Sequence, residues 1–335
     1  PLEYADFEGV IPEGQYGAGP SICWDRGVWI EIPSKPGDPP HGLEHGKLLF
    51  ELRGYKLKGL WTLVHTPRNG DNHWLLIKER DGSVDEAGTD GYPHDSILSG
   101  LTVDELGDPR AKAVRLAQEA DVAGAPARTT PSPLPLMLAT AADEPFSRDG
   151  WVFEIKYDGY RIAAERSAGG ALLRSRNGND LTATFPEIAR AVRGLPYPGA
   201  VIDGEVVVHD ASGMPSFALL QKRGRLTRRA DVAAAAVQLP ATYYAFDLLA
   251  FGGRDLRPLP LVERKRLLGE VLPTVGPIRY SEHIAREGEA VFAHAARLGI
   301  EGVVAKKADA PYATGRSDHW LKVRTVRTDD FVVVG

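Results

Sequence analysis

The sequence predicts an α+β protein with two modules, and three features of the chain indicate this fold class. Short β-type runs separated by Gly- and Pro-containing turns fill residues 1–80. Residues 81–132 are acidic, then Ala-rich, then Pro/Thr-rich, which is typical of a linker. From 133 to 330 strand and helix patterns mix without regular alternation, which favours antiparallel sheets over a doubly wound parallel sheet.

Residues 1–80 predict a small all-β, barrel-like module. We expect strands at 21–24, 28–32, 47–52, 61–65 and 74–78. Asn69-Gly70 lies between two apolar runs and favours a hairpin there. Within the linker, Thr102 and Glu105 have capping-box spacing and predict a short helix, and 111–120 is expected to form another.

Residues 133–330 predict the larger domain. The expected strands are 151–156, 160–166, 171–175, 200–208, 242–249, 302–306 and 320–324, and the expected helices are 185–193, 261–271 and 287–298.

The bulk properties exclude several classes of protein. The single cysteine, Cys23, excludes an internal disulfide and a Cys-based metal cage, and fits a reducing cytosol. No apolar run approaches the roughly 20 residues of a membrane span. The net charge of −5 argues against a polyanionic partner, but residues 81–132 hold ten acids and only four bases. The remaining chain is close to neutral, so DNA is not excluded as a partner. The first residue is not Met, and we expect a piece of a longer protein.

A lysine at the end of an apolar strand is the first candidate for chemistry. In the run Trp151-Val-Phe-Glu-Ile-Lys156, alternation places Glu154 and Lys156 on one face of the strand. Asp158-Gly159 then turns the chain, and Arg161 begins the return strand. A lysine in the wall of a β pocket can lose its proton and act as a nucleophile. Taken alone, this short motif favours a surface lysine beside a turn, since four-residue motifs recur by chance.

Acids and an aromatic follow in apolar strands. Asp203 and Glu205 lie in Val201–Val208, where buried acids are costly unless they bind a metal, a cation or a hydroxyl. Phe246 is placed to stack on a base, although core packing competes as its role. Arg176, at the end of a strand, can clamp a phosphate or a ribose, although taken alone its motif favours a solvated turn.

The last cluster is mostly cationic. Lys322 and Arg324 share a strand face, and Glu301 precedes Lys306 in the run Glu301-Gly-Val-Val-Ala-Lys306. Strict alternation would place Glu301 and Lys306 on opposite faces, so both line one pocket only if Glu301 lies before the strand or at a bulge. A carboxylate here can hold Mg²⁺ against phosphates.

Together these motifs resemble the covalent nucleotidyltransferase superfamily of DNA ligases, RNA ligases and mRNA capping enzymes. The ordered series runs over Lys156-Tyr-Asp-Gly-Tyr-Arg161, Ser175-Arg-Asn-Gly178, Asp203-Gly-Glu205, Phe246-Asp247, Glu301-Gly-Val-Val-Ala-Lys306 and Trp320-Leu-Lys322. The resemblance implies an antiparallel-sheet, ATP-grasp-like adenylation domain over 133–330. It also implies that residues 331–335 begin an OB domain.

The resemblance implies a role for each motif residue. Lys156 is implied to form the covalent bond to AMP, with ATP and Mg²⁺ (or Mn²⁺) as cofactors. The other implied roles are adenine recognition by Glu154, ribose and phosphate binding by Arg161, Arg176, Glu205 and Arg316, adenine stacking by Phe246, phosphate contacts by Lys306 and Lys322, and metal binding by Glu301 and Glu205.

The N-terminal run Tyr4–Gly19 resembles the 3′-phosphoesterase module of the bacterial ligase D family, in which Tyr4 matches an active-site tyrosine. That family's metal-binding His/Asp/Arg cluster is not matched in this chain, so we expect no phosphoesterase activity from it. The resemblance implies an ATP-dependent DNA ligase of non-homologous end joining. It would act on nicked or broken duplex DNA with a Ku-type end-binding partner, and it would be cytoplasmic and nucleoid-associated.

Two alternatives stay open at the level of sequence. One is an RNA ligase or GTP-using capping enzyme of the same superfamily, which the phosphoesterase-like segment speaks against. The other is a non-catalytic piece that binds DNA ends or serves as a scaffold.

Overall fold

The computed structural model describes residues 5–33, 42–67, 73–83, 88–127 and 135–325. The chain divides into two compact units, one built from residues 1–97, 101–107 and 274–276 and the other from 98–100, 108–273 and 277–335. No helix in the described ranges is long and apolar enough to cross a membrane. The boundaries predicted for the functional domains stay predictions.

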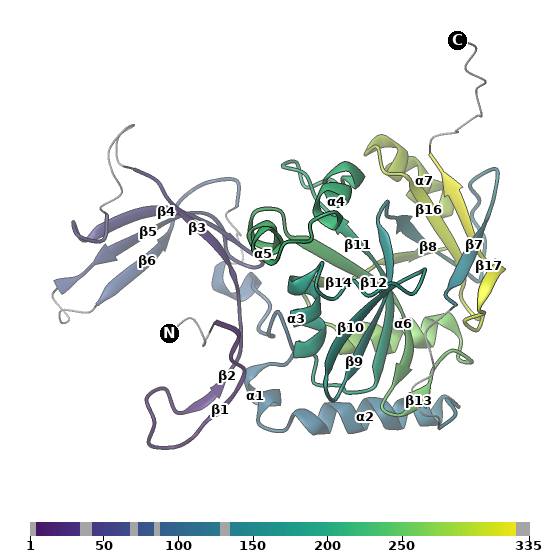
Figure 1. Ribbon diagram of the computed structural model, residues 1–335, viewed down its shortest axis with the longest axis horizontal. Helices are drawn as coiled ribbons and strands as arrows, with labels where there is room; N and C mark the ends of the chain where they lie inside the picture. Colours follow the sequence, from purple (N-terminus) through teal and green to yellow (C-terminus); the bar gives the residue numbers. More distant parts are fainter. Residues whose placement is uncertain (1–4, 34–41, 68–72, 84–87, 128–134, 326–335) are drawn as a thin grey trace, which may run out of the picture. The chain divides into compact units, whose positions relative to one another are not determined.

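The first unit is rich in strands, as the sequence predicts. Its elements are β1 (Gly9–Ile11), β2 (Gly19–Ser21), β3 (Gly27–Glu31), β4 (Lys47–Gly54), β5 (Lys58–His65), β6 (Trp74–Lys78), η3 (Gly88–Gly91) and α1 (Val103–Leu106). Four strands form an antiparallel sheet in the order β3-β4-β5-β6, and β1 pairs with β2 (Figure 1).

One strand prediction for this unit needs correction. The strand expected at 21–24 ends at Ser21, because only 19–21 pairs with β1. Among the described residues β3 and β6 are the outer strands of the four-stranded sheet. Leu48, Phe50 and Trp61 form a small core on one face of the sheet. The Asn69-Gly70 turn lies outside the described residues, but β5 and β6 on either side of it do pair antiparallel.

The second unit mixes helices and strands. Its elements are α2 (Pro109–Val122), β7 (Met137–Ala141), β8 (Trp151–Lys156), β9 (Tyr160–Ser167), β10 (Gly170–Ser175), α3 (Pro186–Gly194), β11 (Ala200–Val208), α4 (Phe217–Gly224), α5 (Arg229–Gln238), β12 (Ala241–Phe251), β13 (Arg254–Asp255), α6 (Leu261–Val271), β14 (Ile278–Tyr280), β15 (His283–Ala285), α7 (Gly288–Arg297), β16 (Gly302–Lys307) and β17 (Gly315–Arg324).

Two sheets organise this unit. The six-stranded sheet has the order β10-β9-β11-β12-β13 with β14 beside β12, and the five-stranded sheet has the order β15-β8-β16-β17-β7. Most pairings are antiparallel, as predicted. Two pairings among the described strands are parallel, β12 with β14 and β17 with β7. Helices α3 and α6 pack on the six-stranded sheet.

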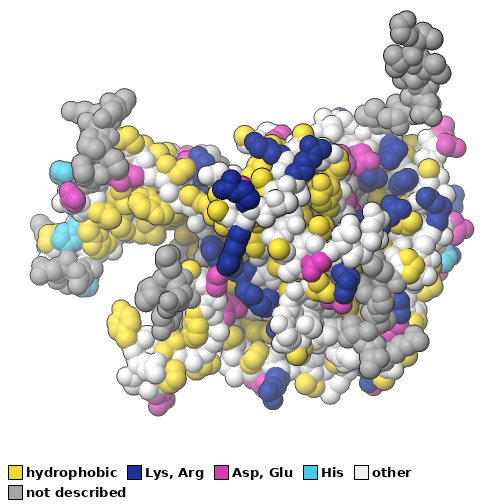
Figure 2. Space-filling model, viewed as in Figure 1, with side chains coloured by type: hydrophobic (Ala, Val, Ile, Leu, Met, Phe, Trp, Pro, Cys, Tyr) yellow, Lys and Arg dark blue, Asp and Glu magenta, His cyan; other side chains and the backbone are white. Residues whose placement is uncertain are grey.

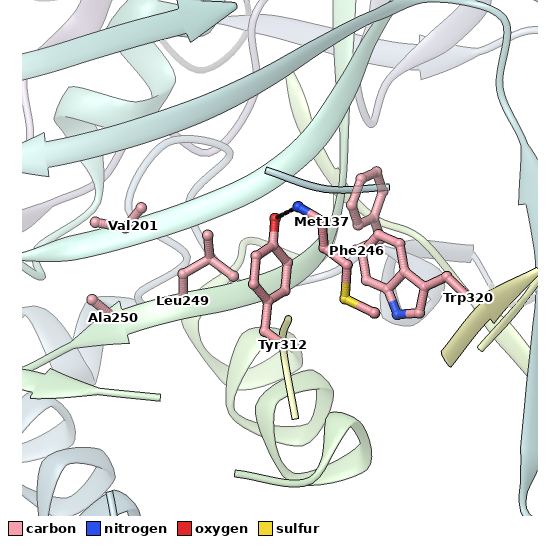
Figure 3. Packing of buried hydrophobic residues seen from close by; sticks show 7 residues of the cluster. All are labelled: Met137, Val201, Phe246, Leu249, Ala250, Tyr312 and Trp320. Carbon is pink, nitrogen blue, oxygen red and sulfur yellow. Dashed lines mark hydrogen bonds between the residues drawn. The ribbon is translucent and has the colours of Figure 1, made fainter. Parts of the chain in front are cut away.

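Alternation of side chains decides what each face of the five-stranded sheet contacts. One face carries Phe153, Val303 and Ala305, which pack with Val291 and Ala295 of α7. A second core joins the two sheets and contains Val201, Phe246 and Leu249 of the six-stranded sheet with Met137 and Trp320 of the other (Figure 3). Tyr312 lies among them, and its hydroxyl oxygen accepts a hydrogen bond from the Met137 backbone N–H at 2.9 Å (Figure 3). The same hydroxyl donates to Asp203 of the six-stranded sheet. The opposite face of the five-stranded sheet is therefore held against the six-stranded sheet.

The short helices predicted inside the 81–132 stretch are confirmed. In α1 the Thr102 hydroxyl accepts from the Glu105 backbone N–H and the Glu105 carboxylate accepts from the Thr102 N–H, which is a capping box. Helix α2 spans Pro109–Val122 and covers the predicted 111–120 segment. The stretch is thus partly helical.

Candidate active site

A cavity of about 200 Å³ lies between the two sheets of the second unit. Nine residues predicted from the sequence line it: Glu154, Lys156, Arg161, Arg176, Glu205, Phe246, Lys306, Arg316 and Lys322. Tyr4 lies outside the described residues. The structure therefore brings together predicted side chains that lie up to 168 positions apart in the sequence, from Glu154 to Lys322.

The strand registers explain why so many polar side chains meet on one face. Glu154 of β8 is opposite Val304 of β16, which is opposite Lys322 of β17. Directly paired residues point to the same side of a sheet, and so do residues two apart. Lys156, Lys306 and Trp320 share this face for the same reason. The prediction that Glu154 and Lys156 lie together on one face is confirmed.

Lys156 ends β8 opposite Gly302, where no side chain fills the face. Its Nζ donates a hydrogen bond to the carboxylate of Glu301. Glu301 stands just before β16 begins, so the strict alternation of that strand does not apply to it. Its carboxylate meets Lys156, although Glu301 itself is not among the residues that line the cavity. This is one of the two arrangements that the sequence allowed. Arg324 Nε lies 3.3 Å from the other oxygen of Glu301.

Glu154 is buried with two lysines. Its Oε1 lies 2.9 Å from Lys265 Nζ and its Oε2 lies 2.8 Å from Lys306 Nζ. Burial acts to raise the pKa of Glu154, but the two ammonium groups outweigh it and the pKa is lowered. For Lys306, burial dominates and lowers the pKa to about 8. The adenine-recognition role implied for Glu154 stays a prediction, since in this structure both its oxygens face lysines.

Arg161 connects the two sheets through charge and ring contacts. Its Nε and Nη2 donate to Asp203 at 2.6 and 2.7 Å, a bidentate pair. The guanidinium carbon lies 4.5 Å from the centre of the Phe246 ring and 5.3 Å from that of Trp320. Asp203 also accepts from the Tyr312 hydroxyl at 2.6 Å, so this buried acid is fully paired. Asp203 therefore positions Arg161 rather than lining the cavity.

Phe246 reaches the cavity because β12 is irregular at this residue. The register of β12 against β11 skips Phe246 between the pairs Asp203–Asp247 and Gly204–Ala245. Such a bulge redirects the side chain of the extra residue. Lys306 Nζ lies 4.1 Å from the ring centre of Phe246 and 4.4 Å from that of Trp320. The two rings thus form an aromatic wall that already binds cations.

Glu205 lines the cavity as a carboxyl group that resists ionisation. Burial raises its pKa to about 7, opposed by the nearby Arg161 and Lys156 and supported by Asp203 and Glu301. Among the described residues no group of three or more His, Cys, Asp or Glu has metal-binding geometry. A cation here would therefore rely on one or two carboxylates and on oxygens of a ligand, which suits Mg²⁺.

Three cations stand at the rim of the cavity. Arg176 follows β10 and is exposed, and Arg316 is exposed with its Nη1 donating to the Ala139 carbonyl at 2.9 Å. Partial burial lowers the pKa of Lys322, and the positive charges of Arg324, Lys156 and Arg316 lower it further. Mutual repulsion of this kind is relieved by an anion.

Sequence reasoning missed two residues of the site. Trp320 was seen only as part of a motif, although it lines the cavity. Lys265 of α6 was missed altogether, because a lysine in a charged helix normally faces solvent, yet it is 1% exposed and also donates to the Ser281 carbonyl at 3.0 Å. The run Leu267-Leu268 and Leu261 around it did signal a buried helix face, and that was the available clue.

Family models match both parts of the chain. A model described as ATP dependent DNA ligase domain matches residues 136–324, and one described as DNA Ligase D 3'-phosphoesterase domain matches residues 1–65. The first match contains every described site residue.

Relatives that align with the whole chain are named as multifunctional proteins. The multifunctional non-homologous end joining protein LigD of Pseudomonas aeruginosa is 36% identical over 100% of this chain and 39% of its own length. The multifunctional non-homologous end joining DNA repair protein LigD of Mycobacterium tuberculosis is 34% identical over 100% of this chain and 36% of its own length. The chain thus spans about two fifths of these relatives.

A solved structure of mycobacterial DNA ligase D complexed with ATP and MES is 34% identical, with a TM-score of 0.49 over 56% of this chain and 59% of that one. Because the ligase model covers residues 136–324 of 335, which is more than half of the sequence, the chain belongs to the ATP dependent DNA ligase domain family.

Proposed function

We propose that this chain joins DNA strands through a covalent Lys156–AMP intermediate formed from ATP. The observation that carries the proposal is the placement of Lys156 Nζ against Glu301 in a cavity that also holds an aromatic wall and several cations. A nucleophile, a base-stacking surface and phosphate ligands are what adenylyl transfer needs in one place.

In the first step the Lys156 amine attacks the α-phosphate of ATP. An N–P bond forms, the P–O bond to pyrophosphate breaks, and the lysine nitrogen gives up a proton. Phe246 and Trp320 contact the adenine. Lys306, Lys322 and Arg316 offset the growing charge on pyrophosphate. AMP then passes to a DNA 5′-phosphate, and a 3′-hydroxyl finally displaces it.

The carboxylates of Glu301 and Glu205 fit a divalent cation. Glu205 keeps a high pKa beside other acids, and such a group gains from a bound cation that offsets the repulsion. We propose these two residues as ligands for Mg²⁺ or Mn²⁺, which when bound would neutralise charge on the phosphates.

The wider biological role is also part of the proposal. The names of the relatives support non-homologous end joining. We propose nicked or broken duplex DNA as the substrate and a Ku-type end-binding protein as the partner. A cytoplasmic, nucleoid-associated location follows from that role. Tyr4 is proposed as a remnant site of the phosphoesterase module, whose predicted extent is 1–80, followed by the 81–132 linker, the ligase domain at 133–330 and the OB start at 331–335.

Adenylation is tested with α-labelled ATP and Mg²⁺. We expect label on the wild type, loss of it in Lys156→Ala, and normal labelling in Lys307→Ala, an exposed lysine at the end of β16. Labelling of Lys156→Ala as strong as that of wild type would contradict the assignment. Competition by GTP would instead indicate a capping-type enzyme, and preference for an RNA nick would indicate an RNA ligase. Nick binding without any adduct would indicate a scaffold.

A further inference from the structure

An exposed basic surface lies on α4 and α5, and its residues are not among those that line the cavity. The segment 217–238 contains five basic residues and one acid. Lys222, Arg225, Arg228 and Arg229 are exposed, and together they are called here the α4–α5 basic surface. Figure 2 shows Lys and Arg side chains gathered over these two helices. This concentration contrasts with the chain as a whole, whose net charge is −5.

The fifth basic residue of the segment, Arg223, has a structural role. Arg223 is fully buried and donates to the Thr184 carbonyl at 2.7 Å and to both oxygens of Glu187 at 3.1 and 3.0 Å. It also lies 5.4 Å from the centre of the Phe185 ring. Arg223 thus anchors α4 to α3, and the fold does not need the four exposed cations for that purpose.

The exposed cations are poorly balanced by acids. Asp231 is the single acid of the segment, and its carboxylate lies 3.5 Å from Arg228 Nε, with side chains 45% and 81% exposed. A pair this exposed contributes little. The neighbouring positions of α5 are mostly alanine, as in Ala233-Ala-Ala-Ala236, so small side chains surround the charges. An exposed, positive surface next to small side chains suits close approach of a phosphate backbone.

Helix α4, which carries part of this surface, packs on a residue close in sequence to Lys156. Helix α4 follows β11, whose residue Val206 pairs with Tyr160, the residue before Arg161. The Tyr160 ring lies 6.1 Å from that of Phe217 at the start of α4. At Gly224, the end of α4, a Cβ would lie 2.7 Å from the same ring. Both ends of α4 therefore pack on a residue that is four positions from Lys156.

We propose that Lys222, Arg225, Arg228 and Arg229 bind the phosphate backbone of duplex DNA and hold it beside the Lys156 cavity. This inference rests on the proposed function and adds a DNA-binding surface to it. Backbone contacts of this kind fix the position of a duplex without reading its sequence. The surface therefore serves nicks and ends of any sequence.

The salt dependence of DNA binding tests the proposal. The logarithm of the binding constant falls with the logarithm of salt concentration with a slope of about 0.9 for each phosphate contact. We expect replacement of all four cations by Ser to reduce that slope by about 3 to 4 for a nicked duplex of mixed sequence. Affinity at low salt should fall more than tenfold. Replacement of Arg228 and Arg229 alone, at the exposed start of α5, should give about half of the change in slope.

A matched control removes the same number of charges elsewhere on this unit. Arg148, Arg286, Arg297 and Lys307 are all exposed, and Arg286 and Lys307 lie near Asp149 and Asp309. Their joint replacement by Ser should leave the slope within 1 of wild type. A charge-retaining variant, with Lys222→Arg and the three arginines changed to Lys, should keep the wild-type slope. An unchanged slope in the two-residue and four-residue Ser variants, or an equal loss in the control, would overturn the proposal.

Self-adenylation separates this inference from the proposed function. Lys156–AMP formation needs no DNA, so it is measured on wild type in the same preparation. If the wild type forms no adduct while the Ser variants show a smaller salt slope of DNA binding, the ligase proposal is contradicted and the DNA surface is supported. A wild type that forms the adduct and shows no effect of the Ser variants contradicts the DNA surface alone.

Discussion

Lys306 carries a positive charge in surroundings that oppose it. The side chain is 2% exposed, lies between the Phe246 and Trp320 rings, and depends on Glu154 as its carboxylate partner. Burial lowers its pKa to about 8, with the charge of Lys265 adding to the effect and those of Glu154 and Asp247 opposing it. Lys306 is therefore mostly protonated only below that pH, and it can bind phosphate as a cation only there.

This leads to a pH dependence of adenylation. As pH rises through about 8, Lys306 loses its proton and the charge that would offset pyrophosphate is lost, so the rate should fall. In Lys306→Arg the group stays charged, because guanidinium does not lose its proton in this range. That variant should be slower at pH 7 but should lack the decline near pH 8. Single-turnover adenylation rates from pH 6.5 to 9.5 measure both, and an identical alkaline limb in the two proteins would refute the idea.

Replacement of Lys265 tests independently whether the charge of Lys306 controls the pH dependence of adenylation. Its ammonium lowers the pKa of Lys306, so its removal in Lys265→Met should move the alkaline limb to higher pH. A purely structural role for Lys265 would lower the rate at every pH without moving the limb. Lys58→Met, at the start of β5, serves as the comparison because its side chain is exposed and it belongs to the first unit rather than to the unit that holds the cavity.

At the scale of elements, β16 depends on a residue with no side chain. A Cβ at Gly302 would lie 2.1 Å from the Val323 carbonyl oxygen of β17, and backbone cannot move out of its way cheaply. Gly302 is also the residue opposite Lys156 and follows Glu301 directly. The bare position lets β16 and β17 approach while Glu301 reaches the nucleophile.

Gly302→Ala should therefore separate the two strands locally and move Glu301. We expect a loss of about 1–3 kcal/mol in the free energy of unfolding, typical of overpacking, and a fall in the adenylation rate. Gly169→Ala is the control, since a Cβ there would have only the Ser167 hydroxyl at 3.9 Å as a neighbour. Urea melts and adduct yields report the two effects, and wild-type values for Gly302→Ala would show that the strands can spread without cost.

Long elements with clear patterns were predictable from the sequence, and short ones were not. Helix α6 begins and ends at the predicted residues, Leu261 and Val271, and β8 spans the predicted 151–156. Strands β14 and β15 have three residues each and exist because they pair with β12 and β8, which are distant in sequence. Such pairing leaves no local pattern to read.

The site divides in the same way. Glu205 could be predicted because an acid in an apolar strand requires a reason. Lys156 and Lys306 could be predicted only from the ordered series of motifs, since the short motif around Lys156 taken alone favours a surface lysine. The bulge at Phe246 and the pairing of Lys265 with Glu154 depend on registers and helix packing that the order of residues does not reveal.

At the scale of the whole molecule, the four-stranded sheet of the first unit exposes apolar side chains. Trp29, Trp74 and Leu76 lie on one face and Leu75 and Ile77 on the other, with exposed fractions between 36% and 55%. Figure 2 shows hydrophobic side chains over this unit. Contiguous exposed apolar surface of this kind promotes association.

We therefore expect this chain to self-associate as its concentration rises. Leu75→Lys with Ile77→Lys should reduce the association, because charges on an edge strand oppose pairing and apolar contact. Val122→Lys with Val237→Lys, at two isolated exposed valines on α2 and α5, should not. Sedimentation velocity over a hundredfold concentration range compares the three proteins, and concentration-independent behaviour of the unaltered chain would be the contrary result.

Arg161 serves both sheets of the second unit at once, since it binds Asp203 and lies against Phe246 and Trp320. Replacement of any one of these residues changes the surroundings of the other three, so the effects of two replacements should not add. Random single replacements here are then tolerated only when a neighbour has already changed to suit them. We expect the residues at these four positions to change together among related proteins. A replacement that is harmless in one relative should then be damaging in another.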